Sequence, residues 1–453
     1  MRRVGKSWYR RSLEAGDRLV ARMRGAFAVG SDRPRIAAAV TGEFPLYFHS
    51  FAYQELVGLH EGLGAEVRVF HLLDGDQGQL DDSFRYLSRS RQRLPNAREI
   101  WAADLAYYQA RMPERVDALL GRIAAASGLT VEEVVADEAL QRAFTFTRRL
   151  ELWQPDYIHT YFFYAESLGG LVAQQLLGIP RGVTAYADHV LDDWPMKVVP
   201  LHVETADLVV ATSRRVRDEL LDASGVATSD LKAKIVVKPN GVDGRRFPFS
   251  ERRAPSGGGI EVVSVSRIEP KKGLLELVDV AVECERRGLP VRFHVVGGPD
   301  TGRPDSVAYA AALDEKVERS GVTGSFSMHG RRSQRELVPL LRDVDAFVAP
   351  YIETEDGDKD GIPTAVLEAM SSGLAIVATD AGSITEVIDD GVEGRVVAQR
   401  DPGAMAAALA ELLAEPGLAG RMGRHAHERF ERDFDVSVTE GSLHERLARL
   451  LVP

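Results

Sequence analysis

Hydrophobic positions along the chain fall into two kinds of segment that alternate. Short apolar runs rich in β-branched residues are followed by longer segments whose apolar positions recur at helical spacing. This alternation is typical of a parallel α/β architecture, because each helix there connects two parallel strands. The strands predicted in the N-terminal half are residues 35–42, 66–73, 155–163, 182–186, 207–212 and 234–242.

Two segments interrupt the alternation. Residues 85–150 are charged and helix-favouring, and they predict a helical insertion. Residues 247–259 (FPFSERRAPSGGG) have the composition of a linker, so we place a domain boundary there. The second series of predicted strands comprises residues 260–267, 291–298, 325–330, 345–351, 374–380 and 394–398.

The pattern therefore predicts an α/β protein with two doubly wound, Rossmann-like domains that face a cleft. The expected division is a basic N-terminal segment (1–34), an N-terminal domain with the insertion (35–246), a C-terminal domain (247–430) and a C-terminal helix (431–453) free to pack back on the N-terminal domain. Ligands of open parallel sheets bind at the carboxyl ends of the strands, where helix N-termini favour anions. The turns that follow strands are therefore the places to look for chemistry.

Composition narrows the class of protein. The chain has 453 residues, of which 45% are hydrophobic and 27% charged, which is ordinary for a soluble globular protein. Its one cysteine, Cys284, excludes an intramolecular disulfide and a cysteine-rich metal site. The net charge of −11 argues against a nucleic-acid partner, because such proteins normally present a basic surface.

The N-terminus departs from this acidic balance. Residues 1–24 hold eight Lys or Arg interleaved with apolar residues. A segment of this kind can contact an anionic membrane peripherally, although a solvated or partner-docked helix is the more ordinary interpretation. We find no continuous apolar core of a signal peptide and no run of about 20 apolar residues that would span a bilayer. We therefore expect a cytoplasmic protein, with peripheral membrane contact as an open alternative.

The first chemistry-bearing turn is RIEPKKG, at the end of the predicted strand 260–267. Arg267 and Lys272 flank a strand-to-helix turn, where two fixed cations can hold a diphosphate and offset its charge as it leaves. A basic helix start on the surface is the alternative. Cations are mildly unfavourable near a helix N-terminus, so their presence favours an anion there.

The second turn is the acidic segment 351–362 and the helix after it. Asp360 and Glu368 bracket the start of this helix, and a carboxylate accepts hydrogen bonds from two vicinal sugar hydroxyls. Backbone N–H groups of Gly361, Ile362 and Thr364 can meet phosphate, while Pro363 suits a first helical turn. The other acidic residues are expected to be a solvated loop, and their spacing fits no Ca²⁺ loop, so no metal is expected. They are Glu353, Glu355, Asp356 and Asp358.

The third turn, in TDAGSITEVI, contains Gly382, which allows close backbone approach to a ligand. Ser383 and Glu386 after it have the spacing of a capping box at the start of a helix, which accounts for both.

Together these stretches resemble the donor domain of the retaining, GT-B-fold glycosyltransferases of family 4. RIEPKKG is similar to the family pattern R-x4-K-G, and DGIPTAVLEAMSSGLAIVAT to EGIPxxLxEAMAxGxPVVxT. The similarity covers residues 240–430 well. In the N-terminal half, TGEFPLYFHSFAYQEL, YIHTYFF and TAYAD resemble family patterns more loosely but in the same order.

The resemblance implies a role for each matching residue. Arg267 and Lys272 would hold the donor diphosphate, Glu368 the ribose hydroxyls, and Asp360 would face the donor sugar. The backbone of residues 361–364 would line the phosphates and the sugar. The positions that would frame the base or approach the donor are Gly297, Gly298, Arg331 and Gly382.

Two departures from the family pattern bear on catalysis. Asp360 replaces the usual glutamate, so its side chain is one methylene shorter. Tyr186 stands where the family often has histidine, and a phenol is a poor base at neutral pH because it ionises near pH ~10. Further cleft or acceptor candidates are Gly42, His159 and Asp188, with His189 as an alternative base or an ordinary surface histidine.

The implied activity is transfer of a sugar from a nucleotide-diphosphate sugar to an acceptor hydroxyl, with retention and without a metal or other cofactor. The acceptor would be a sugar, a lipid-linked glycan or a small molecule. Two alternatives remain open: another GT-B reaction, such as epimerisation or non-glycosidic coupling, and a non-catalytic sugar-nucleotide-binding protein. No G-x-G-x-x-G follows the first strand of either half, which disfavours an NAD-dependent dehydrogenase.

Overall fold

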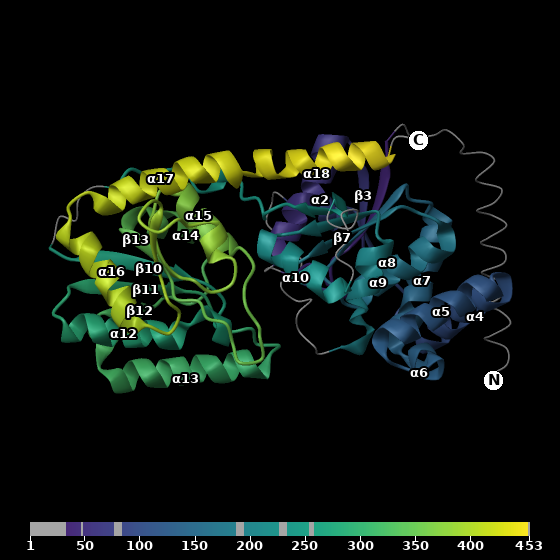
Figure 1. Cartoon of the computed structure of the whole chain (residues 1–453), viewed down its shortest axis with the longest axis horizontal. Coiled ribbons are helices and arrows are strands. Elements are labelled where there is room, and N and C mark those ends of the chain that lie inside the picture. The colour runs from purple at the N-terminus through teal and green to yellow at the C-terminus, as the bar shows by residue number, and fades with distance from the viewer. Residues whose placement is uncertain are drawn as a thin grey trace.

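The computed structural model describes residues 33–46, 49–76, 84–186, 194–225, 233–252 and 258–451. Two large parallel sheets, one from each half of the chain, form two lobes that lie side by side (Figure 1). The segment 1–24, with its predicted membrane contact, lies outside the described residues. The described part of the chain contains no helix that is both long and apolar enough to cross a membrane.

The N-terminal sheet has seven parallel strands in the order β5-β3-β1-β6-β7-β8-β9. The order runs outward in both directions from the neighbours β1 and β6, so the topological switch point lies between them. The strands are β1 (Arg35–Ala39), β3 (Glu66–His71), β5 (Arg91–Arg93), β6 (Tyr157–Tyr161), β7 (Arg181–Ala185), β8 (Leu208–Ala211) and β9 (Ile235–Val237), and a separate pair is formed by β2 (Glu43–Phe44) and β4 (Leu73–Asp74).

The C-terminal sheet has six parallel strands in the order β12-β11-β10-β13-β14-β15. This is the doubly wound order of dinucleotide-binding folds, with the switch point between β10 and β13. The strands are β10 (Ile260–Val265), β11 (Val291–Val296), β12 (Phe326–Met328), β13 (Ala346–Ala349), β14 (Ala375–Thr379) and β15 (Gly394–Val397). Their side chains are largely buried because helices cover both faces of such a sheet.

The helices of the N-terminal lobe are α2 (Ser50–Leu63), α3 (Arg85–Arg89), α4 (Arg98–Arg111), α5 (Pro113–Ser127), α6 (Val131–Ala136), α7 (Glu138–Trp153), α8 (Ala165–Leu177), η5 (Pro195–Lys197), α9 (Val199–Thr205) and α10 (Arg214–Ser224). The predicted insertion 85–150 is mainly helical, but it is not wholly so. It also supplies the edge strand β5, which pairs with β3. The polar sequence of β5 (RQR) hid this strand, because an edge strand needs no apolar face.

The helices of the C-terminal half are η6 (Gly244–Arg246), η7 (Pro270–Lys272), α12 (Leu274–Arg286), α13 (Pro304–Ser320), η8 (Val322–Gly324), α14 (Gln334–Asp343), α15 (Thr364–Ser371), η9 (Ile384–Glu386), α16 (Pro402–Ala414), α17 (Leu418–Asp433) and α18 (Val436–Leu451). The helix α18 extends from α17 across to the N-terminal lobe and packs on α2 (Figure 1). Its Leu443 and Leu447 are fully buried in the core of that lobe.

A buried ionic cluster accompanies this packing. Lys238, just after β9, lies 2.9 Å from a carboxylate oxygen of Glu55 on α2 and 3.1 Å from one of Glu440 on α18. The Tyr161 hydroxyl donates to Glu55 at 2.8 Å. The three charged side chains hold α2, β9 and α18 in one arrangement, because each would be left uncompensated if its partner moved away.

Candidate functional site

The switch point of the C-terminal sheet places the two predicted donor-binding turns next to each other. Arg267 lies two residues beyond β10, and the loop beyond β13 leads to Asp360. Gly273 packs so closely on this loop that a Cβ would lie 1.8 Å from the Pro350 carbonyl oxygen, and its φ is +61°. Only glycine fits there, so the Lys272-Gly273 step has a local structural reason: it lets the two turns meet.

The cations of the first turn pair with the acidic loop of the second. Lys271 Nζ lies 2.9 Å from Asp358 Oδ1, and Lys272 Nζ lies 2.5 Å from Asp360 Oδ2. Arg267 contacts Glu269 at 3.0 Å. The expectation that all of the acidic residues form a solvated loop is therefore wrong for Asp358, whose carboxylate partners Lys271.

The Lys272–Asp360 pair has a clear electrostatic signature. Burial alone would raise the pKa of Asp360, but the positive charges of Lys272 and Lys271 outweigh it and hold that pKa below the ordinary value. Asp360 is therefore ionised at neutral pH. Lys272 also lies 4.7 Å from the centre of the Tyr351 ring, a cation–π contact that fixes the ammonium in place.

Glu368 lies on α15, whose first helical residue is Thr364. Pro363 precedes it as the N-cap, with extended φ and ψ, so it stands one position earlier than the predicted first turn. Burial raises the pKa of Glu368 to about 7, and Arg246 offsets part of the rise. A carboxylate with this pKa lacks the compensating contacts that Asp360 has. Such a carboxylate can accept hydrogen bonds from ligand hydroxyls, whereas the backbone N–H groups of Gly361 and Ile362 can only donate.

Gly382 lies against the same loop from the other side. Its φ is +62°, and a Cβ on it would stand 2.3 Å from the Asp360 carbonyl oxygen. The expected close approach of Gly382 is thus to the chain's own backbone. The predicted capping box of Ser383 and Glu386 is wrong: the helix there is the single turn η9, and no side chain caps it.

Glu386 instead caps a helix of the other lobe. Its carboxylate accepts hydrogen bonds from the backbone N–H groups of Arg214 and Arg215, each at 2.8 Å, at the start of α10. Ser383 Oγ lies 2.9 Å from Ser213 Oγ. Glu386 therefore caps a helix, as the sequence predicts of it, but the helix is α10 of the other lobe. Tertiary packing places the N-terminus of α10 within hydrogen-bond distance of the Glu386 carboxylate.

Further contacts join the lobes at the loop that carries Asp360. Arg215 Nη2 donates to the Asp360 carbonyl oxygen at 2.8 Å, and Lys359 Nζ lies 3.2 Å from Glu219 Oε1. A Cβ on Gly361 would lie 3.5 Å from Thr212 Oγ1. Sequence reasoning missed Arg215 and Glu219. The sequence signal that could have revealed them is the strand-to-helix turn after β8. This turn lies at the carboxyl end of its strand, as the other candidate ligand-binding turns do.

The remaining donor-site candidates lie beyond β11 and β12. Gly297 has φ +147°, and a Cβ on it would lie 1.7 Å from the Ser266 carbonyl oxygen, so this position requires glycine. The side chain of Arg331 covers Gly298, where a Cβ would lie 2.9 Å from Arg331 Cγ. Gly297, Gly298 and Arg331 are therefore neighbours, and they lie beside the strand end that carries Arg267.

In the N-terminal lobe, the switch point places Gly42 beyond β1 and Phe162 beyond β6. Phe162 has φ +64°, a costly conformation for a residue with a large side chain, and such strain concentrates at functional sites. Its ring lies 4.8 Å from that of Tyr186 and 5.5 Å from that of His49, while Phe51 lies 4.7 Å from Tyr186. We call Phe51, Phe162, Tyr186 and His49 the aromatic cluster.

The aromatic cluster contains residues that sequence reasoning did not single out. Of its four members only Tyr186 was predicted. Burial and then the positive charge of Arg267 lower the pKa of His49 to about 3, so this imidazole is neutral at physiological pH. Contacts of Arg215 and Ser213, beyond β8, with Asp360 and Ser383 show that the carboxyl ends of the two sheets face each other. Asp188 and His189 lie outside the described residues.

His159 is not at the cleft, contrary to the sequence-based expectation. It lies within β6 with no exposed surface, and its Nε2 is 3.2 Å from Glu55 Oε1 and 2.8 Å from Thr184 Oγ1. Its Nδ1 is 3.2 Å from the Tyr157 hydroxyl. We expected His159 to face the cleft, whereas β6 continues through Tyr161 and keeps the imidazole in the core.

Fold and site together define a class. Two doubly wound domains meet through the carboxyl ends of their strands, and cations flank the strand-to-helix turn at a switch point, where phosphates bind in such folds. The chain matches the family described as "Glycosyl transferases group 1" over residues 259–415 and "Glycosyltransferase Family 4" over residues 135–246. It belongs to the family 4 glycosyltransferases, which have the GT-B fold.

Relatives of known name agree with this assignment. The chain is 30% identical over 293 residues to WcaL of Salmonella typhimurium, a glycosyltransferase named for colanic acid biosynthesis, covering 62% of this chain and 68% of WcaL. It is 23% identical over 427 residues to the amylovoran biosynthesis glycosyltransferase AmsK of Erwinia amylovora, covering 90% and 98% of the two chains.

Among solved structures, HepE of Anabaena, crystallised with UDP and glucose, shares the fold. The superposition has a TM-score of 0.69 and 16% identity, and it covers 92% of this chain and all of HepE. The predicted α/β class, the GT-B architecture and the family are confirmed.

Proposed function

We propose that this glycosyltransferase moves a sugar from a nucleoside-diphosphate sugar to an acceptor hydroxyl with retention of anomeric configuration. The position of Arg267 and Lys272 carries the proposal. These cations flank the turn after β10, and charged groups fixed at this place can bind a diphosphate and stabilise it as it departs. Glu368 would accept hydrogen bonds from the nucleotide ribose, and Asp360 from the transferred sugar.

The pairing of Lys272 with Asp360 supports a specific division of roles. A bound diphosphate would share the Lys272 ammonium with Asp360, whose carboxylate would keep its place beside the sugar. The aspartate reaches Lys272 at 2.5 Å despite its shorter side chain. The replacement of the family's glutamate is therefore compatible with binding, and it would act on which sugar is accepted.

The reaction would proceed on one face of the donor sugar. The bond between the anomeric carbon and the diphosphate oxygen breaks, the acceptor oxygen bonds to the same face, and the acceptor proton passes to the departing phosphate. This route asks the protein for positioning and charge stabilisation. It suits the aromatic cluster, where Tyr186 is a poor base and His49 is held neutral. It would need no metal ion, so activity should survive EDTA.

The names of the relatives suggest the setting. WcaL and AmsK are named for the biosynthesis of extracellular polysaccharides, and HepE was crystallised with UDP and glucose. We propose that this chain likewise builds a polysaccharide or related glycoconjugate in the cytoplasm, with a sugar, lipid-linked or small-molecule acceptor. The nucleotide base and the sugar remain to be found by experiment.

The test begins with thermal shifts across UDP-, GDP- and ADP-sugars, because a ligand at 100 times its Kd adds about 2.7 kcal/mol to the apparent stability. The donor found in this way is then offered to saccharide acceptors, and the anomeric configuration of the product is read by NMR. Arg267→Ala combined with Lys272→Ala should abolish transfer while the fold is retained.

A matched control removes one lysine and one arginine elsewhere in the same lobe. Lys316→Ala combined with Arg319→Ala on α13 should leave transfer unchanged, since both side chains are at least a quarter exposed and lie outside the site. Near-normal transfer by the Arg267 and Lys272 double variant, or a product of inverted configuration, would refute the proposal.

A further inference from the structure

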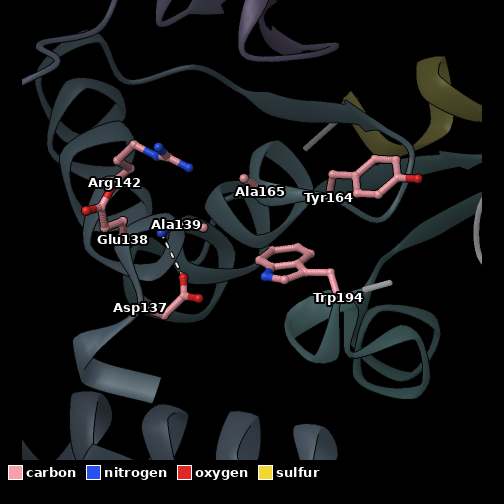
Figure 2. Close-up of a pocket in the computed structure, with 7 residues that line it drawn as sticks. All are labelled: Asp137, Glu138, Ala139, Arg142, Tyr164, Ala165 and Trp194. Atoms are coloured by element: carbon pink, nitrogen blue, oxygen red, sulfur yellow. Dashed lines mark hydrogen bonds between the residues drawn. The ribbon is translucent and has the colours of Figure 1, made fainter. Parts of the chain in front are cut away.

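A cavity of about 420 Å³ opens in the N-terminal lobe, between the insertion and the helix that follows β6 (Figure 2). Its volume falls within the range of about 300–1,000 Å³ that is common for small-ligand sites. Asp137 and Arg142 line it from the start of α7, Tyr164 and Ala165 from the start of α8, and Trp194 from the residue before η5. Nothing in the reaction described above uses this cavity.

Arg142 is the group in the cavity with unmet bonding capacity. Its Nε is buried and has no hydrogen-bond acceptor, and the guanidinium rests 5.6 Å from the centre of the Trp101 ring. Figure 2 shows the side chain extending from α7 toward Ala165. A buried Nε–H donor without an acceptor is unfavourable, and a carboxylate or phosphate would satisfy it with paired hydrogen bonds to the guanidinium.

The acidic residues of the cavity are already engaged. Asp137 Oδ1 accepts hydrogen bonds from the backbone N–H groups of Ala139 and Leu140 at 2.8 and 3.1 Å, as the cap of α7. Glu138 is paired with Arg98. Their charges therefore serve the helix and a surface arginine. Glu166 is the acidic residue that interacts with Arg142: burial raises the pKa of this carboxyl, and the positive charge of Arg142 offsets part of the rise.

The other walls suit a sugar ring. Trp194 and Tyr164 present aromatic surface, which gives apolar contact to the C–H face of a sugar while polar groups take its substituents (Figure 2). The 13-residue helix α8 begins at Ala165, and the side chain of its N-cap residue, Tyr164, makes no capping hydrogen bond. Glu166 in the first turn of α8 meets the positive end of this helix through a hydrogen bond to its own backbone N–H.

The cavity lies next to the aromatic cluster, because Tyr164 lines the one and contacts the other. The Tyr164 ring lies 6.4 Å from that of Phe162 in the aromatic cluster. Glu166, one residue beyond Ala165, approaches the turn after β1, since a Cβ on Gly42 would lie 3.2 Å from Glu166 Oε1. An acceptor whose hydroxyl lies at the aromatic cluster could therefore extend into the cavity.

We propose that this cavity binds an anionic sugar unit of the acceptor, one that carries a carboxylate or a phosphate held by Arg142 and a ring held against Trp194. The inference rests on the proposed function, because it assumes an acceptor at the carboxyl ends of β1 and β6. It makes Arg142 a determinant of acceptor specificity that lies outside the donor site.

The test reads binding at Trp194 directly. The full chain has four tryptophans, so labelling with 5-fluorotryptophan gives a simple ¹⁹F spectrum in which Trp194→Phe identifies the signal of Trp194. Methyl glucuronide and methyl glucoside are the matched probes, since they differ only in the carboxylate. Glucose 6-phosphate tests the phosphate form, and inorganic phosphate tests the anion alone.

We expect methyl glucuronide or glucose 6-phosphate to shift the Trp194 signal saturably, with affinity about tenfold or more above that of methyl glucoside, as for a hydrogen bond to a charged group. Arg142→Gln should remove this preference, and Arg319→Gln on α13 should not. Equal binding of the glucoside, an unmoved Trp194 signal, or inorganic phosphate matching the sugars would overturn the proposal.

The two proposals fail separately. If nucleotide sugars bind and react while the Trp194 signal stays still, only the acceptor pocket is refuted. If the anionic sugars bind at Trp194 but no nucleotide sugar binds or reacts, the transferase proposal fails and the pocket stands as a binding site. Variants that lose the fold are recognised by circular dichroism, and Arg142→Lys, which keeps the charge, then takes the place of Arg142→Gln.

Discussion

Glu386 should stabilise the contact between the two lobes, and the change Glu386→Ala tests this. In the structure its carboxylate accepts the N–H groups of Arg214 and Arg215 at 2.8 Å each, and its Oε2 lies 3.4 Å from the Arg214 side chain. These bonds cross from η9 in one lobe to α10 in the other. Removing them leaves the N–H groups of Arg214 and Arg215 without this acceptor, while Val216 keeps its bond to the Ser213 hydroxyl.

The size of the effect follows from the exposure of the partners. Loss of a helix cap costs about 0.5–2 kcal/mol, and a hydrogen bond to a charged group contributes about 1.5–3 kcal/mol. The side chain of Arg214 is 64% exposed, so water can replace part of what is lost and the ion pair itself adds little. We expect a net loss of about 1–3 kcal/mol in the contact, which is roughly 5- to 150-fold in its equilibrium.

Amide hydrogen exchange measures this directly, in a peptide that spans residues 212–217. The exchange of that peptide should accelerate by up to the same factor in Glu386→Ala, and less in Glu386→Gln, which keeps one acceptor oxygen. Glu251→Ala, which removes an exposed glutamate paired with Arg424, is the control and should change nothing there. If exchange in 212–217 is the same in Glu386→Ala as in the unaltered protein, the cross-lobe cap contributes nothing and the reasoning is wrong.

Three further predictions concern buried ionisable groups. Burial raises the pKa of Glu368 to about 7. The folded protein therefore prefers the neutral carboxyl, and Glu368 costs stability as pH rises from about 4.5 to 7. Affinity for the nucleotide sugar identified by thermal shift should rise around pH 7, because the ionised carboxylate is the better acceptor, and Glu368→Gln should lose this dependence. A calorimetric pH profile unchanged by the substitution would count against a ribose role. Lys238→Met should lower the free energy of unfolding, measured in urea, by about 3–5 kcal/mol, because it leaves the carboxylates of Glu55 and Glu440 without their cation in the core. A loss below about 1 kcal/mol would show that the cluster contributes little to stability. Burial raises the pKa of the Cys284 thiol to about 12, so iodoacetamide at pH 8 should modify it only after unfolding in urea, and rapid alkylation of the native protein would contradict its burial.

Much of the fold was accessible from periodicity alone. Buried parallel strands are continuous apolar runs, so β10, β13 and β14 stand out in the sequence. The edge strand β5 does not, because its residues Arg91–Arg93 need no apolar face. The burial of His159 was not predicted either. A polar residue in a strand suggests an exposed position unless its buried partners, here Glu55 and Thr184, are known.

The candidate site likewise contains residues that local sequence patterns predict and residues that they do not. The cationic turn with Arg267 and Lys272 and the helix with Glu368 were found from local motifs, because each consists of particular residue types at short spacing in the chain. Apart from Tyr186, the residues of the aromatic cluster and of the cavity at Arg142 were not predicted from the sequence. They come from segments far apart in the chain and share no local pattern.

The sequence by itself determined the two-fold repetition of strand and helix, the family and the residues of the cationic turn after β10. These depend on short-range chemistry: hydrophobic periodicity, turn residues and the spacing of charges within one loop. Only the tertiary structure decided the partners of those residues. It paired Lys272 with Asp360, turned Glu386 from a local cap into a bond between lobes, and left Arg142 facing a cavity, because each pairing depends on which distant segments the packed sheets bring within a few ångströms.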